Sequence, residues 1–239
     1  MTPFRQPPAN AARTARADGE ATRVNILEAA GQLFAQHGYA HTTSKAICER
    51  AQTNMAAVNY YFGSRDGLYL EVLNLVQERL MSMAFLHRLV DSPIPASEKL
   101  GRFMHALVDS TLDPGRWHTR VWAREILSPS PLRSVVMRDQ TLPKFDILSR
   151  IVGDIAGVPP DDEDIASYVF TIIAPCLMLL VVDRRADLPI QAMFKRPAAE
   201  LAAHLTRFAV AGLEAVGAQR AAILSSVPAS SGEISPGLP

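Results

Sequence analysis

The stretch from Thr43 to Leu68, TSKAICERAQTNMAAVNYYFGSRDGL, constrains the fold of this chain more than any other segment. Thr43 is a good residue to cap the start of a helix, and Asn54 is a strong candidate to cap a second one. Gly63 predicts the end of that second helix, because glycine tolerates the left-handed conformation found after a helix. Ser64 then predicts a further helix start. The stretch therefore predicts two short helices joined by a tight turn, followed by a third.

Apolar spacing predicts that these helices share a small core. Ile47 and Ala51 lie four residues apart, as do Val58 and Phe62, so each pair can face inward on its helix. A preceding helix over about residues 21–37, ended by Gly38, carries its own apolar stripe. That stripe consists of Ile26, Leu27, Ala30, Leu33 and Phe34.

The second short helix, Met55 to Tyr61, would present its remaining side chains to the outside. Two short helices around a tight turn form a helix-turn-helix, in which the second helix enters the DNA major groove. Ala56 and Ala57 are small enough for a close approach to base edges, and Asn59 can donate and accept hydrogen bonds at once, as readout of adenine requires. We therefore predict an operator-binding unit over residues 21–66.

Two segments also resemble a known family. ILEAAGQLFAQHGYAHTTSKAICERA and NMAAVNYYFGSRDGLY resemble the DNA-binding domain of TetR-family transcriptional repressors over about residues 21–70. WAREILSPSPLRSVVMRDQTLPKF is similar to the regulatory domain of CecR-type members. The resemblance implies phosphate contacts by Tyr61 and Arg65, with Lys45 a weaker candidate. The full predicted DNA-binding set is Thr43, Lys45, Met55, Ala56, Ala57, Asn59, Tyr60, Tyr61 and Arg65.

The rest of the chain predicts further helices, so the expected fold is all-α: a three-helix helix-turn-helix domain followed by a helical regulatory and dimerisation domain over 67–217. Helices are expected over 64–90, 97–112, 116–127, 132–155 with a kink or break at Pro143, 162–184 and 197–216, with a loop or short helix over 189–194. Residues 1–20 are expected to form a flexible arm, whose Arg13 and Arg16 either reach a minor groove or are simply solvated. Residues 218–239 are expected to be a disordered tail.

The longest apolar run, Ala166 to Val182, is too short for a membrane span and is interrupted by Pro175. A helix that is apolar almost all round must be covered on every side. We therefore expect the helices over 162–184 and 197–216 to form a homodimer interface, with two from each subunit. A charge introduced at Leu179 is expected to disrupt it.

The resemblance further implies a cavity in the regulatory domain for a small hydrophobic effector. The candidate lining residues include Trp117 and Phe170, which we favour first, although aromatic and methionine side chains at helical spacing more often form a core. The complete candidate set is Phe103, Met104, Trp117, Arg120, Trp122, Glu125, Met137 and Phe170.

Composition excludes several other classes. The chain has 239 residues, is 48% hydrophobic and carries no net charge, which argues against a basic nucleic-acid coat. His37 and His41 straddle Gly38 and lack further ligands nearby, so no metal is expected. The sequence contains no phosphate loop, nucleophile elbow or zinc-ligand spacing, so we expect neither an enzyme nor a cofactor. Without a leader-like apolar segment, we expect a cytoplasmic protein acting at the nucleoid. An effector-independent or activating DNA-binding protein is the alternative.

Overall fold

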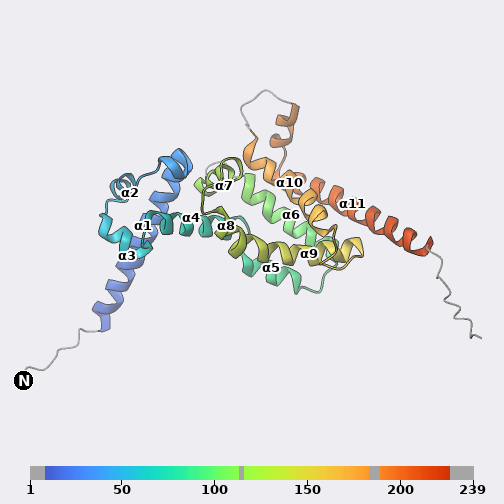
Figure 1. The fold of residues 1–239 in the computed structure, drawn as a ribbon, viewed down its shortest axis with the longest axis horizontal. Helices are drawn as coiled ribbons and strands as arrows, with labels where there is room; N and C mark the ends of the chain where they lie inside the picture. The colour runs from blue at the N-terminus through green and yellow to red at the C-terminus, as the bar shows by residue number, and fades with distance from the viewer. Residues whose placement is uncertain (1–8, 113–115, 183–188, 227–239) are drawn as a thin grey trace, which may run out of the picture.

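The structure is a computed structural model that describes the backbone of residues 9–112, 116–182 and 189–226, with side chains from residue 18 onward except that of Leu224. The described residues form helices and contain no strand, as the sequence predicts. Figure 1 shows an elongated molecule with the N-terminal helices at one end and helix α11 reaching towards the other.

The N-terminal unit has the predicted helix-turn-helix arrangement. It comprises α1 (Ala9–His41), α2 (Ser44–Arg50), α3 (Met55–Phe62) and the start of α4 (Arg65–Leu80). Each of the three predicted caps makes its hydrogen bond, because the side chains of Thr43, Asn54 and Ser64 accept from backbone N–H groups three residues further on. Gly63 follows α3 with a φ of 72°, as its position after the helix requires.

Helix α1 is longer than predicted. It begins at Ala9, so residues 9–20, expected to be a flexible arm, continue the helix; residues 1–8 of that arm lie outside the described residues. Gly38, where we predicted the helix to end, has a φ of 77° and kinks the chain, and a last turn continues to His41. Thr42 closes this corner by donating its hydroxyl hydrogen to the Gly38 carbonyl at 2.8 Å. The glycine therefore acts as a bend within α1.

The predicted single helix over 64–90 is two helices, α4 and α5 (Met83–Val90). The break falls at Met81, whose backbone is extended, and Ser82 then caps α5 by accepting from the Phe85 N–H at 3.1 Å. The next helices, α6 (Ala96–Leu112) and α7 (Trp117–Leu127), lie within a residue of their predicted bounds.

Pro143 produces a π-helical turn. Helix α8 (Arg133–Val136) runs into the π-helical turn η1 (Met137–Thr141) and then into α9 (Leu142–Ala156). Pro143 has no N–H to donate to the carbonyl four residues back, and its ring would crowd that carbonyl. The preceding Leu142 N–H instead reaches back five residues to the Met137 carbonyl, which widens the helix at this point.

The C-terminal part contains α10 (Ile165–Val181), a 3₁₀ helix η2 (Pro189–Lys195) and α11 (Ala198–Ser226). Pro175 lies inside α10 as predicted. Helix α11 continues ten residues beyond its predicted end at 216, so residues 218–226 of the expected tail are helical, and 227–239 lie outside the described residues. Arg220 fastens this extension by a bidentate ion pair with Asp162 at 2.8 Å.

No helix among the described residues has the length and apolar character needed to cross a bilayer.

Buried side chains form two clusters, and the first extends past the predicted boundary near residue 66. The first joins α1–α4 with α7, through Trp117, Val121 and Trp122. The second fills the body between α5, α6, α9, α10 and α11. Each cluster contains a free, buried cysteine: Cys48 lies in the first, and Cys176, whose thiol pKa is raised to about 12 by burial, lies in the second. Helices α4 and α7 therefore join the N-terminal unit to the body.

Candidate DNA interface and regulatory body

Helix α3 separates its inward and outward side chains as the sequence predicts. Val58 and Phe62 are buried against α1 and α4. On the other side Asn59 is exposed, and Tyr60 keeps 82% of its surface accessible. Met55 and Ala56 are also exposed, whereas Ala57 is half-buried against the core. The outer face is therefore narrow and consists of small or polar side chains flanked by Met55 and Tyr60.

Tyr60 and Tyr61 have different environments. Tyr61 is half-buried against the first cluster, and its hydroxyl lies close to Gly19 of α1, where a Cβ atom would come within 3.2 Å. The two rings meet edge to face, 5.0 Å between centroids. The residue selected from the family pattern for a phosphate contact, Tyr61, thus supports the recognition helix from behind, while Tyr60 projects into solvent.

Arg65 is engaged within the domain. Its Nη1 donates to the backbone carbonyls of Tyr39 at 3.2 Å and Thr42 at 3.0 Å, and its guanidinium lies 4.3 Å from the centre of the Tyr39 ring. Arg65 therefore holds the corner between α1 and α2 against the start of α4. By contrast, Lys45 on α2 is highly exposed, with only a distant ion pair to Glu49 at 3.9 Å.

The eight residues predicted to line an effector cavity do not form a single site, although two of them, Trp117 and Arg120, line the same cleft between α1, α4 and α7. Trp117 and Trp122 belong to the first cluster, between α7 and the DNA-reading unit. The Trp117 indole lies directly on Gly31 of α1, where any Cβ would clash with its ring, and its Nε1 donates to Glu28 at 2.7 Å. These tryptophans are packing residues of the α1–α7 contact.

Glu125 is also part of that contact. It is only 2% exposed, and its carboxylate accepts a hydrogen bond from the Tyr69 hydroxyl of α4 at 2.7 Å and from the Ser130 N–H. Burial, and then this hydrogen bond, raise the pKa of Tyr69 above its ordinary value. Its neighbour Arg124 donates to the carbonyls of Ala35 and Gln36 near the end of α1 at 2.9 and 2.8 Å. The Arg-Glu pair of the sequence motif thus joins α7 to α1 and α4.

The remaining candidates are scattered. Phe103 is buried in the body core, and Met137 is half-buried in the π-helical turn. Arg120 is exposed on α7, and Phe170, one of the two favoured residues, keeps 71% of its surface accessible on α10. Met104 alone of the eight predicted residues lines the apolar groove described next.

An apolar groove of about 530 Å³ lies between α6, α10 and α11. Its walls include Met104, Ile172, His204, Leu205, Phe208 and Gly212. The α11 residues of this set were not among the ligand candidates predicted from the sequence. Their signal was available, since Leu205, Phe208 and Leu213 recur at helical spacing, but periodicity alone does not distinguish a groove wall from a core face.

Beside the groove, α10 and α11 carry large apolar side chains in solvent. Phe170, Met178 and Phe208 are 71%, 52% and 72% exposed in the single chain. The inward face of α10 contains instead Val169, Ile172, Cys176 and Leu179, all buried. Leu179, the position at which a charge is expected to disrupt the dimer, is only 2% exposed and faces the chain's own core, so a charge there would act on the fold of the subunit itself.

Comparisons with known proteins agree with this architecture. The family model for bacterial regulatory proteins of the tetR family matches residues 26–72, and the model for the C-terminal domain of the HTH-type transcriptional dual regulator CecR matches residues 96–216. The chain is 25% identical over 169 residues to the CecR regulator of Shigella flexneri, covering 66% of this chain and 75% of that one. It is 31% identical over 97 residues to the HTH-type transcriptional regulator LuxR of Vibrio harveyi, covering 41% and 46% respectively.

A solved structure shares the fold. The TetR-family transcriptional regulator PfmR from Thermus thermophilus superposes with a TM-score of 0.55 at 23% identity, over 77% of this chain and 96% of that one. The first family model covers the helix-turn-helix and the second covers the body, so together they match both parts of the molecule. This chain therefore belongs to the TetR family of DNA-binding transcriptional regulators, with a C-terminal domain of the CecR type.

Proposed function

We propose that the protein is a homodimeric repressor that is released from its operator by a small hydrophobic effector. Each subunit would insert α3 into the major groove, with Asn59, Ala56 and Ala57 towards the bases. The exposure of α3 supports this orientation. For the phosphate contacts, exposure favours Tyr60, Lys45 and Thr43, whereas Tyr61 and Arg65 are largely engaged within the domain.

The exposed apolar faces of α10 and α11 support dimerisation through these helices. Contiguous apolar surface of this kind marks an interaction site. Two helices from each subunit would bury Phe170 and Phe208, which the single chain leaves in water. A dimer presents two recognition helices to half-sites about 34 Å apart, or somewhat more.

The apolar groove between α6, α10 and α11 is the observation that carries the proposed effector response. Its volume of about 530 Å³ suits a small organic molecule, and its lining is predominantly apolar. Because α11 also belongs to the proposed interface, an occupant there would alter how the two subunits meet. The effector must bind the arrangement that cannot bind DNA more tightly than the arrangement that can. A coupling free energy of about 1–3 kcal/mol between effector and DNA binding would change operator affinity roughly 5- to 150-fold.

DNA recognition is tested on fragments recovered by genomic pull-down. We expect Asn59→Ala to cost roughly 1–3 kcal/mol on a recovered fragment and much less on random DNA, measured by fluorescence anisotropy. Asn74→Ala on α4 is the matched control and should leave both affinities unchanged. Equal losses on both DNAs would show that Asn59 reads no base.

The effector response is tested by filling the groove. Gly212 lines it, and a Cβ there meets nothing within 4 Å, so Gly212→Leu should occupy the space without a clash. We expect apolar compounds that release the parent protein from DNA to lose their effect on this variant, while its DNA affinity persists. Ala222→Leu, exposed further along α11, should respond as the parent does. A full response in Gly212→Leu would place the effector elsewhere.

An activating or effector-independent regulator is the second candidate. The relative from Shigella flexneri is described as a dual regulator, which favours both modes of action in this branch. A transcription assay on a recovered promoter separates the two, because a repressor lowers transcript yield and an activator raises it.

A further inference from the structure

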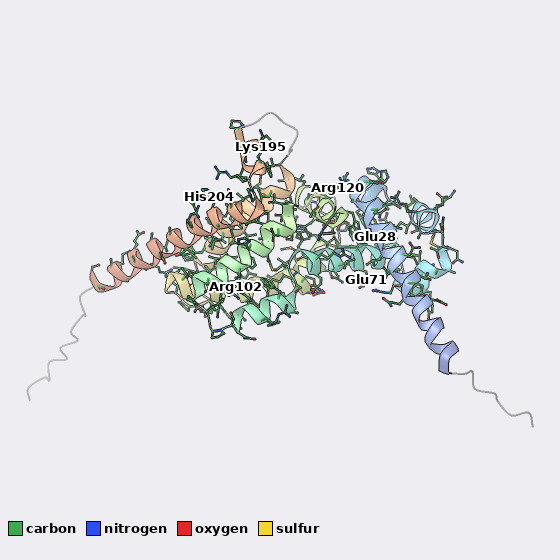
Figure 2. The ribbon with its side chains drawn as sticks, turned by 180° about the vertical axis from the view of Figure 1, so that it is seen from behind. Glu28, Glu71, Arg102, Arg120, Lys195 and His204 are labelled. Carbon is green, nitrogen blue, oxygen red and sulfur yellow. The ribbon has the colours of Figure 1, made fainter. Side chains whose placement is uncertain are left out.

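We propose that a second cleft, between α1, α4 and α7, binds a small organic anion bearing a carboxylate or phosphate, and that its occupancy is communicated to the DNA-reading helices. The communication rests on the proposed function, but the binding itself does not. This cleft lies at the junction of the DNA-reading unit and the body, apart from the apolar groove between α6, α10 and α11. Figure 2 shows Glu28 and Arg120 at this junction, with Arg102 and His204 on the body.

The cleft is polar and cationic. It has a volume of about 410 Å³, large enough for a small planar molecule. Arg79 enters from the end of α4, and Arg116 and Arg120 enter from the start of α7. All three side chains are exposed. Arginine side chains that line one cleft favour a carboxylate or phosphate, which a guanidinium group can bind through paired hydrogen bonds.

The one acidic wall residue does not cancel this charge. Glu28 is a single carboxylate against three arginines in the lining, so the cleft keeps a net positive charge, and its Oε1 accepts hydrogen bonds from Trp117 at 2.7 Å and Gln32 at 3.0 Å. Within the parts of the chain that the structure describes, Arg79 and Arg120 form neither a hydrogen bond nor an ion pair with another residue. Their donors are thus available to an incoming anion.

Trp117 gives the cleft an aromatic wall. Its ring is held against Gly31 and by the hydrogen bond to Glu28, so its position is fixed before a ligand enters. An indole beside guanidinium groups suits an anion attached to a flat, partly apolar body. Aromatic carboxylates and aryl phosphates share this chemistry.

A chain of hydrogen bonds connects the cleft to the helix-turn-helix. Trp117 Nε1 donates to Glu28, Gln32 Nε2 donates to the same oxygen, and Arg50 Nη2 on α2 donates to Gln32 Oε1 at 2.6 Å. Arg50 is the last residue of α2. An anion that binds at Trp117 or Glu28 would therefore disturb the Arg50–Gln32 hydrogen bond, which is one of the contacts between α2 and α1 together with the bond from Asn25 to the Ala51 carbonyl.

Binding is tested with Trp117 as the reporter. The chain has two tryptophans, so Trp117 is the single tryptophan in the Trp122→Phe variant. Benzoate and phenyl phosphate are the anionic probes, and benzamide is a neutral analogue of nearly the same shape. We expect saturable changes in Trp117 fluorescence with at least one anion and at least tenfold weaker binding of benzamide. If Trp122→Phe folds poorly, anion binding to the unmodified protein is measured by calorimetry instead.

Two variants decide whether the arginines carry the binding. Arg79→Ala combined with Arg120→Ala should weaken anion binding at least tenfold, whereas Arg102→Ala, an equally exposed arginine on α6, should leave it unchanged. No saturable response to either anion, or an equal response in the double variant, would overturn the proposed site.

The communication is tested on DNA. The anion that binds should change operator affinity at least fivefold in the parent, and less in Arg50→Ala, although Arg50→Ala keeps the same anion affinity by fluorescence. An anion that binds without changing DNA affinity in the parent would overturn the communication. If the protein bound no DNA at all, the proposed function would fail while the fluorescence result would still decide the site.

Discussion

The buried hydrogen bond between Tyr69 and Glu125 joins α4 to α7 at the scale of single residues. A carboxylate that is 2% exposed is costly to bury unless hydrogen bonds compensate it. Here Tyr69 of α4 and the Ser130 N–H supply those bonds. Because α4 and α7 both pack on α1, this pair fixes the orientation of the DNA-reading unit relative to α7.

Tyr69→Phe should lower the free energy of unfolding by about 1–3 kcal/mol, because it leaves a buried carboxylate short of a donor. Combined with Glu125→Gln in a double-mutant cycle, the pair should show an interaction energy of about 0.5–3 kcal/mol. Urea unfolding measures both quantities. Tyr39→Phe, which removes an exposed hydrogen bond to Asp66, is the control and should cost less. Strictly additive single variants would show that the pair does not couple.

At this scale the sequence predicts what depends on near neighbours. Thr43, Asn54 and Ser64 each cap a helix through a residue three positions away, and all three predictions are confirmed. The roles of Trp117 and Glu125 depend on partners 89 and 56 residues distant, which no local pattern identifies. Arg65 was selected from a family position, and its bonds to Tyr39 and Thr42 become evident only when the corner between α1 and α2 is folded.

At the scale of elements, the end of α4 is one boundary that the sequence did not predict. The apolar stripe continues across Met81 and Ser82, so the sequence favours one helix. In the structure Lys144 of α9 donates to the Gln77 carbonyl at 2.7 Å and to the Gln77 side chain at 3.2 Å. The Gln77 carbonyl also accepts the Met81 N–H at 3.1 Å, so Lys144 is a second donor to the last turn of α4, and Ser82 caps the next helix at once. Pro143, by contrast, acts through its own ring, which is why its disturbance of the helix was predictable.

Burial lowers the pKa of Lys144 to about 8. The unfolded chain keeps the ordinary value near 10.4, so between about pH 8 and 10.4 it binds more protons than the folded chain, and stability rises with pH. Relative to Lys144→Met, the parent should gain about 1–2 kcal/mol in unfolding free energy between pH 7 and 9.5, after allowance for solvent screening. Lys45→Met, on the surface, should track the parent at both pH values. A constant difference between parent and Lys144→Met would contradict the lowered pKa.

At the scale of the whole molecule, the first cluster joins the N-terminal helices to α7 and the second fills the body, from which α11 reaches towards the end opposite α1 (Figure 1). The sequence predicted the all-α class and selected α10 and α11 as the interface helices. It could not say which side of α10 faces outward, because apolar residues surround that helix. Phe170 was therefore placed in a pocket and Leu179 at the interface, whereas the structure exposes Phe170 and buries Leu179.

Phe208→Asp tests the interface on the exposed side. Phe208 is 72% exposed in the single chain, so the change should spare the fold while placing a charge in the proposed dimer contact. We expect a monomer in sedimentation velocity at micromolar concentration, with unchanged helical content by circular dichroism. Leu127→Asp, at an equally exposed apolar residue ending α7, should remain a dimer. Persistence of the dimer in Phe208→Asp would move the interface elsewhere.

The seclusion of the two native thiols has a practical consequence. Cys48 and Cys176 are both buried, and the chain has no other cysteine. A cysteine introduced at the solvent-facing Tyr60 would thus be the one readily alkylated group in each subunit. The distance between spin labels attached there in the two subunits would report how far apart the two recognition helices lie before and after an effector is added.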